Sequence, residues 1–590
     1  MNDNHYYSSA RNTQIVLYLL KANNIRKVIA SPGTQNMSLV VSMQRDPYFE
    51  MYSAADERSA AYMACGLAAE SGETVVISCT GATASRNYLP GLTEAFYRHL
   101  PVVAITSTER ENKIGHGIAQ IIDRRAIPND VAKISVSANA VDTPDDAWNC
   151  MIQVNKALQE IHHHGTGPVH INLEKTDDFD FSITEIPPCR VIRRITPQGM
   201  FPKLTEGKIG IFVGSHLNWS NSSIQAVDNF CAAHNAVVFC DHTSNFKGEY
   251  RVFAPLIASQ EWNESVIFNL DLLIQVGEIS GEYYEVGKLT NHVKEVWRVN
   301  EDGEIRDNLK KLTNIFEMDE ITFFSYYTPR TFEKQRGFYD ECWKEYYEIY
   351  EMIPQSLPLC NIWMAQHMAP ELPENSIVHF GILNSLRSWN FFEIPKSVQT
   401  FSNVGGPGID GGLSTLLGAS LAHPDKIHFG IIGDLAFFYD MNSLGNRHLG
   451  NNVRIMLVNN AKGCEFKLYS HPASRLGEEG DEFIAAARHY GNKSLQLVRH
   501  YAEDLGFEYL TACTKEEFLH VYKHFLSPVD LGHPVLLEVF TNAEDQSDTL
   551  KTINSLKLSK VNQNKDKVKK IIGADNAHAI QRVINKLKGK

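Results

Sequence analysis

The sequence lacks the patterns that mark secreted, zinc-stabilised or membrane-embedded proteins. Its ten cysteines are scattered and no two stand in a Cys-x-x-Cys spacing, so neither a disulfide framework nor a cysteine-ligated zinc site is expected. Residues 1–5 carry no basic and apolar signal segment, and no apolar run is long enough to span a bilayer. We therefore expect a cytoplasmic protein without membrane association.

Positive charge is also scarce. The formal net charge is -13 and the pI is near 6.0, so a nucleic-acid partner is not expected. A chain of 590 residues exceeds what one hydrophobic core supports. The run His162-His163-His164 could ligate a metal, but its place between a helical segment and the turn at 165–168 predicts an exposed helix end. Together these features favour a multidomain enzyme acting on small molecules.

Short apolar runs alternate with helical segments along most of the chain, which predicts an α/β fold. We expect three doubly wound parallel-sheet domains, over 1–190, 200–335 (the central domain) and 355–550. A Lys-rich helical extension (551–590) follows, either as a solvated helix or as a contact for an acidic surface or anionic metabolite. The predicted strands include 27–30, 74–78, 101–105, 168–172, 209–213, 236–239, 272–276, 426–432 and 456–458.

The most informative motif is Gly433-Asp434-Leu435, followed by Asn459-Asn460. Each follows a predicted strand, and residues 437–449 between them have helical apolar spacing. The carboxyl ends of parallel strands share one edge of the sheet, so Asp434 and Asn460 are expected to converge. Their oxygens suit Mg²⁺ or Ca²⁺, and the backbone N–H groups after Asp434 suit an anion. The motif predicts a metal-clamped diphosphate site, although two ordinary turns between strands and helices would leave the same pattern.

A second candidate is Glu57, at the head of a small-residue helix over 58–70. Small neighbours permit close packing, so Glu57 could face an apolar cleft, where burial would raise its pKa. The alternative is a helix-start glutamate favoured by the helix dipole.

Further segments resemble thiamine-diphosphate (ThDP)-dependent 2-oxoacid enzymes, and in detail the SEPHCHC synthases of menaquinone biosynthesis. They occur in order over about residues 10 to 550: 31–34, 56–61, 80–83, 87–90, 94–97, 167–173, 408–411, 433–435, 440–444 and 534–539.

The resemblance implies ThDP and Mg²⁺ as cofactors, bound between two subunits. It also implies that 1–190 is a pyrimidine-binding domain and 355–550 a diphosphate-binding domain. Glu57 would share a proton with the aminopyrimidine, and Gln120 would be a second catalytic residue. Asp434, Asn460 and the backbone carbonyl of Lys462 would hold Mg²⁺. The cofactor contacts implied are Glu57, Thr80, Ile409 (beneath the bent cofactor), Gly433, Asp434, Leu435, Ala436, Asn460, Cys464 and Phe466.

The implied substrate residues are Thr34, Gln35, Arg110 and Arg387. Arg387 matches the family's partner for the distal carboxylate of 2-oxoglutarate. Gln35 and Val404, however, stand where the family has arginines, and the basic pair expected near 279–282 is missing. A dicarboxylate in a desolvated pocket needs such partners. These departures predict an acceptor other than isochorismate.

Three readings remain open. The first is a carboligase that decarboxylates a 2-oxo acid donor and passes the acyl carbanion to a carbonyl or enoyl acceptor. The second is a decarboxylase without an acceptor, and the third an idle scaffold subunit. The resemblance favours the first, with a homodimer as the minimum active unit and a tetramer expected.

Overall fold

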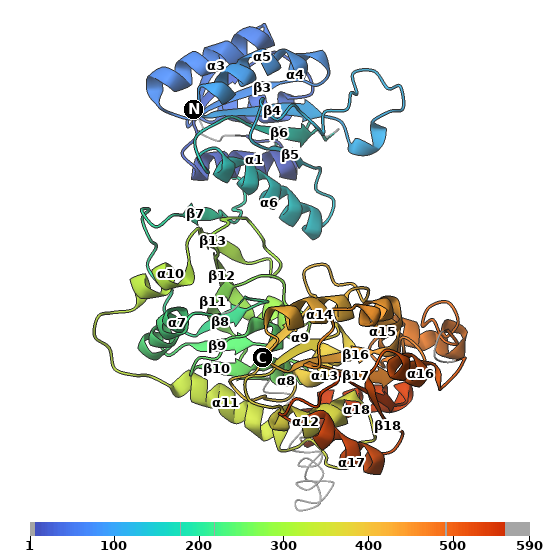
Figure 1. The fold of residues 1–590 in the computed structure, drawn as a ribbon. Coiled ribbons are helices and arrows are strands. Elements are labelled where there is room, and N and C mark those ends of the chain that lie inside the picture. The colour runs from blue at the N-terminus through green and yellow to red at the C-terminus, as the bar shows by residue number, and fades with distance from the viewer. Residues whose placement is uncertain are drawn as a thin grey trace, which may run out of the picture. The chain divides into compact units, whose positions relative to one another are not determined.

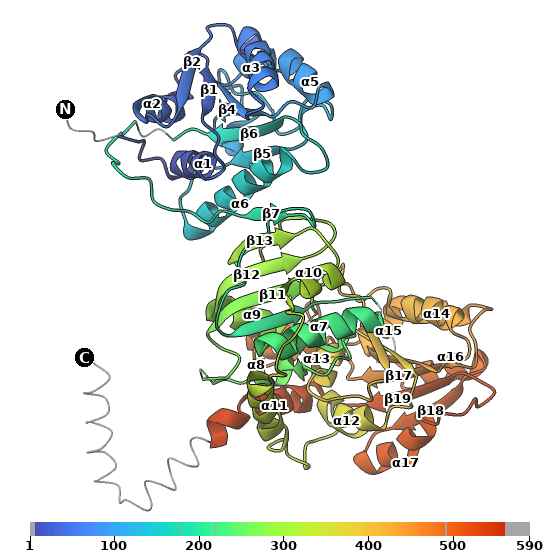
Figure 2. The ribbon, with the colours of Figure 1, turned by 90° about the vertical axis from the view of Figure 1, so that its left-hand side faces the viewer.

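The computed structural model describes residues 6–176, 179–217, 219–262, 264–281, 283–489 and 493–560. The chain separates into two compact units, drawn in Figures 1 and 2. The first comprises Met1–Met200 and Asp302–Glu317, and the second comprises Phe201–Glu301 and the chain from Met318 onward.

The first unit is built on a six-stranded parallel sheet in the order β2-β1-β3-β4-β6-β5. Its strands are β1 (Lys27–Ala30), β2 (Glu50–Ser53), β3 (Val75–Cys79), β4 (Val102–Thr108), β5 (Ser135–Ala138) and β6 (Val169–Glu174). Strands β3 and β6 are buried along their whole length, as strands covered on both faces must be.

Helices cover both faces of this sheet, with α3 and α5 on one side and α1 and α6 on the other (Figure 2). The helices are α1 (Arg11–Ala22), α2 (Met37–Arg45), α3 (Glu57–Ser71), α4 (Thr83–Asn87), α5 (Leu89–Tyr97), η1 (Glu111–Lys113) and α6 (Pro144–Glu160). The unit also holds a parallel strand pair, β7 (Arg193–Ile195) and β13 (Leu312–Phe316).

The second unit contains two parallel sheets. In the first, the strands run in the order β10-β9-β8-β11-β12. These strands are β8 (Ile209–Val213), β9 (Val237–Cys240), β10 (Arg251–Phe253), β11 (Leu270–Val276) and β12 (Val293–Val299). The helical segments around them are α7 (Asn221–His234), η2 (His242–Ser244), α8 (Ala254–Ala258), α9 (Tyr283–His292), α10 (Glu320–Tyr327) and α11 (Gly337–Tyr350).

The other sheet of the second unit carries the diphosphate motif and has the order β15-β14-β16-β17-β19-β18. Its strands are β14 (Ile377–Phe380), β15 (Gln399–Ser402), β16 (His428–Gly433), β17 (Val453–Asn459), β18 (Glu508–Ala512) and β19 (Val535–Phe540). In both ribbon views α14 and α15 lie on one side of it and α12 and α17 on the other. The α-helices are α12 (Asn361–Met368), α13 (Asn384–Trp389), α14 (Gly412–Ala422), α15 (Asp434–Asp440), α16 (Leu497–Asp504), α17 (Lys515–Phe525) and α18 (Ala543–Asn554). Short 3₁₀ segments are η3 (Ala369–Glu371), η4 (Met441–Gly445), η5 (Cys464–Lys467) and η6 (Pro472–Gly480).

The predicted fold class is confirmed: the protein is α/β, with three parallel sheets and interleaved helices. The three domain boundaries stay a prediction; in the structure Asp302–Glu317, expected in the central domain, groups with the first unit. The continuous helix expected over 437–449 is wrong: α15 ends at Asp440 and continues as the 3₁₀ segment η4. Ser414 bonds both oxygens of Asp440 at 2.5 Å, which ties the helix end to α14.

The histidine run is also less exposed than predicted. His163 is only 7% exposed, and its Nδ1 lies 2.9 Å from Glu160. His164 lies 2.9 Å from Glu317 of the segment that joined this unit. The two rings stack at 3.8 Å, and their Nε2 atoms lie 3.5 and 2.9 Å from the two carboxylate oxygens of Glu317. The prediction of an exposed helix end is therefore wrong for His163, because the segment Asp302–Glu317 packs against it.

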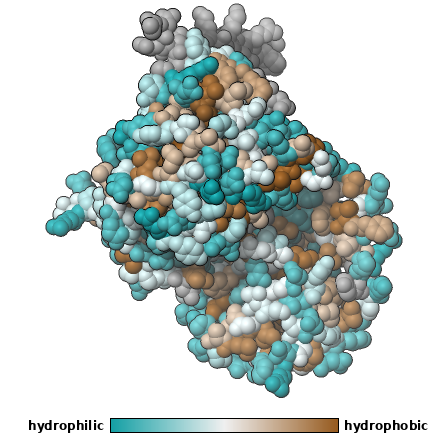
Figure 3. All heavy atoms as spheres, turned by 90° about the horizontal axis from the view of Figure 1, so that it is seen from above, coloured by the Kyte–Doolittle hydropathy of each residue, from teal (hydrophilic) through white to brown (hydrophobic). Residues whose placement is uncertain are grey.

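Two findings bear on the ends and the surface of the chain. The Lys-rich extension lies outside the described residues from residue 561 on, so its predicted helix stays a prediction. Within the described ranges, no helix combines the length and apolarity needed to cross a bilayer. Figure 3 shows a face on which polar and apolar residues are mixed in small patches.

Candidate active site

Asp434 is the first residue of α15 and follows directly on β16. It is 4% exposed, and burial raises the pKa of its carboxyl to about 7, although the N–H groups of Leu435, Ala461 and Asn460 act in the opposite direction. Its Oδ1 accepts from the N–H of Leu435 at 2.8 Å. Its Oδ2 is buried without a hydrogen-bond partner.

The asparagine pair lies at the end of the neighbouring strand. Gly433 of β16 is in register with Val458 of β17, so the residues that follow come level with Asp434. Asn459 anchors the turn, because its amide donates to Glu538 at 2.8 Å and its Oδ1 accepts from Ala461 N–H at 3.2 Å. Asn460 is left with a buried Oδ1 that has no partner.

The two unpartnered oxygens of Asp434 and Asn460 therefore occur at the same edge of one sheet. A buried oxygen without a partner costs roughly 1–3 kcal/mol. Mg²⁺ prefers carboxylate and carbonyl oxygens and would satisfy both atoms at once. The residues present thus fit a hard divalent cation, in agreement with what the motif predicts.

The segment after Asn460 packs tightly around this point. A Cβ on Gly463 would lie 2.9 Å from the ring of Phe466 and 3.3 Å from Leu435, so only glycine fits. Cys464 is 6% exposed, and burial raises the pKa of its thiol, with the nearby Glu465 and Asp434 adding to the effect. The Lys462 ammonium donates to Asp481 at 2.8 Å.

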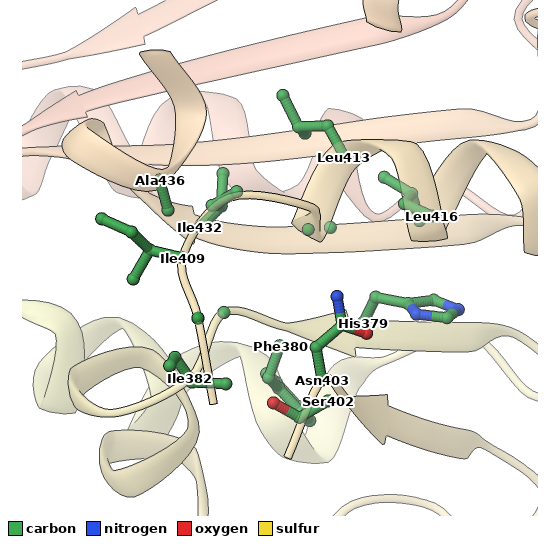
Figure 4. A pocket seen from close by; sticks show the side chains of 14 residues that line it. His379, Phe380, Ile382, Ser402, Asn403, Ile409, Leu413, Leu416, Ile432 and Ala436 are labelled. Carbon is green, nitrogen blue, oxygen red and sulfur yellow. The ribbon is translucent and has the colours of Figure 1, made fainter. Parts of the chain in front are cut away.

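A largely apolar pocket adjoins the motif on the side of α14. Figure 4 shows Ile409 between Ala436 and Ile382, with His379, Ser402 and Asn403 on the strands opposite α14. Burial lowers the pKa of His379 to about 4, so it is neutral at physiological pH. Ile409 and Ala436, predicted as cofactor contacts, are brought together here.

Glu57 heads α3 in the first unit. It is half-buried, and Asn87 donates to its Oε2 at 3.2 Å. The preceding Asp56 caps the helix, accepting from the N–H groups of Arg58 and Ser59. Within one chain, Glu57 is therefore more open to solvent than a side chain in the predicted apolar cleft would be.

Close packing of small residues positions α3, as predicted. A Cβ on Gly91 of α5 would lie 2.4 Å from the Cβ of Ala61, so the two helices approach as nearly as their backbones allow. Nearby, Gln35 Oε1 accepts from Gly81 N–H at 3.0 Å, and a Cβ on Gly33 would lie 2.6 Å from the Cβ of Thr80. The loop carrying Thr34 and Gln35 therefore touches the Thr80 turn, beside the ends of β1 and β3.

Comparison with known proteins shows the family of the chain. Residues 11–127 match the family described as thiamine pyrophosphate enzyme, N-terminal TPP binding domain. The chain is 30% identical over 572 residues to 2-succinyl-5-enolpyruvyl-6-hydroxy-3-cyclohexene-1-carboxylate (SEPHCHC) synthase of Bacteroides thetaiotaomicron, covering 92% of this chain and 98% of that protein. It is 31% identical over 567 residues to the synthase of the same name from Phocaeicola vulgatus, with the same coverage. This chain belongs to the SEPHCHC-synthase family. It is therefore a member of a ThDP-dependent enzyme family.

Two residues that were predicted to bind substrate are engaged within the chain. Arg387 on α13 donates through both terminal nitrogens to Glu465, at 2.8 and 3.0 Å. Arg110 donates in the same way to Asp142, at 2.8 and 3.1 Å. Gln120 is exposed, at a φ of 64°, in the segment between β4 and β5.

Two of the three positions predicted to lack a basic residue, Val404 and the segment 279–282, lie together. A Cβ on Gly281 would lie 2.8 Å from Val404 and 2.5 Å from Leu386, the neighbour of Arg387. Val404 is 5% exposed and apolar. Gly281 and Val404 thus form an uncharged contact at these positions. Glu282 lies outside the described residues.

Sequence reasoning missed Glu465, the residue that holds Arg387. It stands between two predicted cofactor contacts, Cys464 and Phe466, and this position was the only available signal.

Proposed function

We propose that this protein is a ThDP- and Mg²⁺-dependent carboligase that decarboxylates a 2-oxo acid and transfers the acyl carbanion to an acceptor other than isochorismate. When bound, ThDP supplies the electron sink for loss of CO₂. The observation that carries the proposal is the pair of buried, unpartnered oxygens on Asp434 and Asn460.

The residues of the chain take distinct roles in this proposal. Asp434, Asn460 and the backbone carbonyl of Lys462 hold Mg²⁺ against the diphosphate. Ile409 supports the cofactor from below. Glu57 holds or shares a proton at the aminopyrimidine, which requires water to be excluded around its carboxyl group.

A second subunit would supply that exclusion. Three large apolar side chains stand exposed on the helices around Glu57: Tyr62 and Met63 on α3, and Tyr97 on α5. Exposed apolar side chains of this size favour a protein partner. We propose a homodimer as the minimum active unit, with Glu57 facing the diphosphate site of the partner, and a tetramer as the full assembly.

The acceptor is proposed from the charge of a cleft in the second unit. Residues after β8, β9, β11 and β12 line it together with the loop 401–405, at the sheet edge where α/β proteins bind ligands. Its charged lining is mainly acidic, with Glu278, Glu301 and Glu320, and His216 lies 3.2 Å from Glu320. Val404 lines the same cleft. An anionic acceptor such as isochorismate would be repelled, which favours a neutral ketone or keto-sugar.

The test is a donor and acceptor screen with mass detection of products. Pyruvate, oxaloacetate, phosphonopyruvate and 2-oxoglutarate are incubated with protein, ThDP and Mg²⁺, with and without candidate ketones, and Asp434→Asn serves as the inactive control. A ligated product that requires the ketone supports the proposal. Free aldehyde with no ligation under any acceptor would make the protein a lyase, and absence of ThDP binding by calorimetry would make it a scaffold. Rapid turnover of isochorismate with 2-oxoglutarate would refute the proposed acceptor class.

A further inference from the structure

The ion pair between Arg387 and Glu465 is the most informative feature that the proposed function leaves unexplained. Both terminal nitrogens of Arg387 meet both oxygens of Glu465, at 2.8 and 3.0 Å. The side chains are 11% and 20% exposed, so the pair is largely withdrawn from water. A fork-to-fork geometry of this kind is the strongest arrangement that arginine makes with a carboxylate.

The ion pair joins segments that follow the two strands on either side of β16, the strand that ends in the metal motif. Arg387 lies on α13, which follows β14, and Glu465 lies on η5, which follows β17. Strand β16, with Asp434 at its end, runs between β14 and β17. Glu465 is two residues after Gly463, where a Cβ would lie 3.3 Å from Leu435, the residue that follows Asp434. The ion pair therefore lies beside the point where the diphosphate and its metal are proposed to bind.

The other cations of this turn are engaged in the same way. Lys462 donates to one oxygen of Asp481 at 2.8 Å, and Lys467 pairs with the other oxygen. Arg387, Lys462 and Lys467 thus each have a carboxylate of the chain as partner. A second carboxylate on a substrate would have to compete with these carboxylates for the three cations.

Resting on the proposed function, we infer that Glu465 is a specificity-determining residue that selects a 2-oxo acid donor with a single carboxylate. The planar fork of Arg387 matches any carboxylate. Glu465 is covalently tethered beside it and competes at a high effective concentration with a carboxylate on a mobile substrate. A substrate that displaced Glu465 would also leave that charge largely desolvated and unpaired. Donors with a neutral side chain avoid both costs.

The inference is tested by ligand binding, independently of turnover. Full-length protein loaded with ThDP and Mg²⁺ is titrated by calorimetry with glutarate and with pentanoate, five-carbon acids without a keto group. We expect the unaltered protein to show no preference for glutarate. Glu465→Gln, which keeps the size of the side chain but frees the charge of Arg387, is expected to bind glutarate about tenfold more tightly than pentanoate, a gain of about 1.4 kcal/mol. Adding Arg387→Gln should abolish that gain.

The matched control is Glu516→Gln, which neutralises an exposed carboxyl on α17, far from Glu465 in the sequence. It should leave both affinities unchanged. Glu465→Ala is the second variant if Glu465→Gln folds poorly. The inference is overturned if neither variant gains affinity for glutarate, or if the unaltered protein already prefers it by tenfold. Failure of the proposed function would be visible separately, as absence of ThDP binding before any acid is added.

Discussion

At the scale of single residues, ionisation of Asp434 couples metal binding to pH. Its pKa is about 7, raised by burial from an ordinary value of 3.8. The folded protein therefore holds this proton more tightly than the unfolded chain. In the metal-free protein, the stabilisation that comes from protonated Asp434 is fully present below about pH 3.8. It is lost as the pH rises through about 7. Mg²⁺ binds the ionised form, so metal binding releases the proton below pH 7.

We predict that Mg²⁺ affinity in the presence of ThDP rises about fivefold between pH 6 and pH 7 and levels off above pH 8. Calorimetry at each pH measures it. Asp434→Asn should lose Mg²⁺ binding and its pH dependence. The same variant should raise the stability of the metal-free protein at pH 8 by about 1–3 kcal/mol, because a buried unpaired charge is removed. Asp425→Asn, at an exposed position before β16, is the control. A flat pH profile in the unaltered protein would contradict the assignment.

Glu57 supports a second residue-scale prediction. Glu57→Gln removes the acid group that shares a proton with the aminopyrimidine, so exchange of the C2 proton of bound ThDP for deuterium should fall by about a hundredfold or more. Quenched-flow exchange followed by NMR measures it. Glu70→Gln, at the exposed far end of α3, should exchange at the normal rate. Normal exchange in Glu57→Gln would remove Glu57 from the mechanism.

The residues differ in how far sequence could place them. Asp434 and Asn460 were predictable because each ends a strand, and neighbouring parallel strands bring their carboxyl ends together. The pairing of Arg387 with Glu465 was not, because it joins segments that meet only across β16. The same limit applies to Arg124, an arginine 4% exposed whose Nη1 has no partner among the described residues. No pattern in the sequence signals such burial.

At the scale of elements, strands were predicted to within a few residues because buried parallel strands are continuous apolar runs. The sequence interpretation placed strands at 27–30 and 209–213, and β1 and β8 have these bounds. Helix ends were harder. Apolar spacing ran on to Leu449, but α15 stops at Asp440 and the chain continues as η4, while the carboxylate of Asp440 accepts hydrogen bonds from Ser414 of α14. Local spacing cannot report such a contact with another helix.

The close approach of α3 and α5 leads to an element-scale prediction. Gly91→Ala would place a Cβ 2.4 Å from Ala61 Cβ and 2.9 Å from its backbone carbon, which cannot move without shifting the helix. We expect a loss of about 1–3 kcal/mol in stability, measured by urea unfolding. Gly418→Ala in α14, where a Cβ would meet nothing within 4 Å, should instead be neutral or stabilising by up to about 1 kcal/mol. Equal effects of the two changes would show that helix contact does not explain Gly91.

At the scale of the whole molecule, the two halves of the site belong to different units: Glu57 to the first, and Asp434 with Asn460 to the second. In a symmetric dimer whose sites form across the interface, each site takes Glu57 from one chain and Asp434 from the other. A dimer of Glu57→Gln with Asp434→Asn would then have one site with both changes and one site with neither.

This arrangement predicts complementation between two inactive variants. Each variant alone should be inactive, whereas a randomly mixed population contains half heterodimers with one intact site each, so about a quarter of full activity should return. Co-expression with two different affinity tags isolates the heterodimer, in which half of full activity is expected. If each site formed within one chain, both sites of the heterodimer would be defective, and activity would not recover.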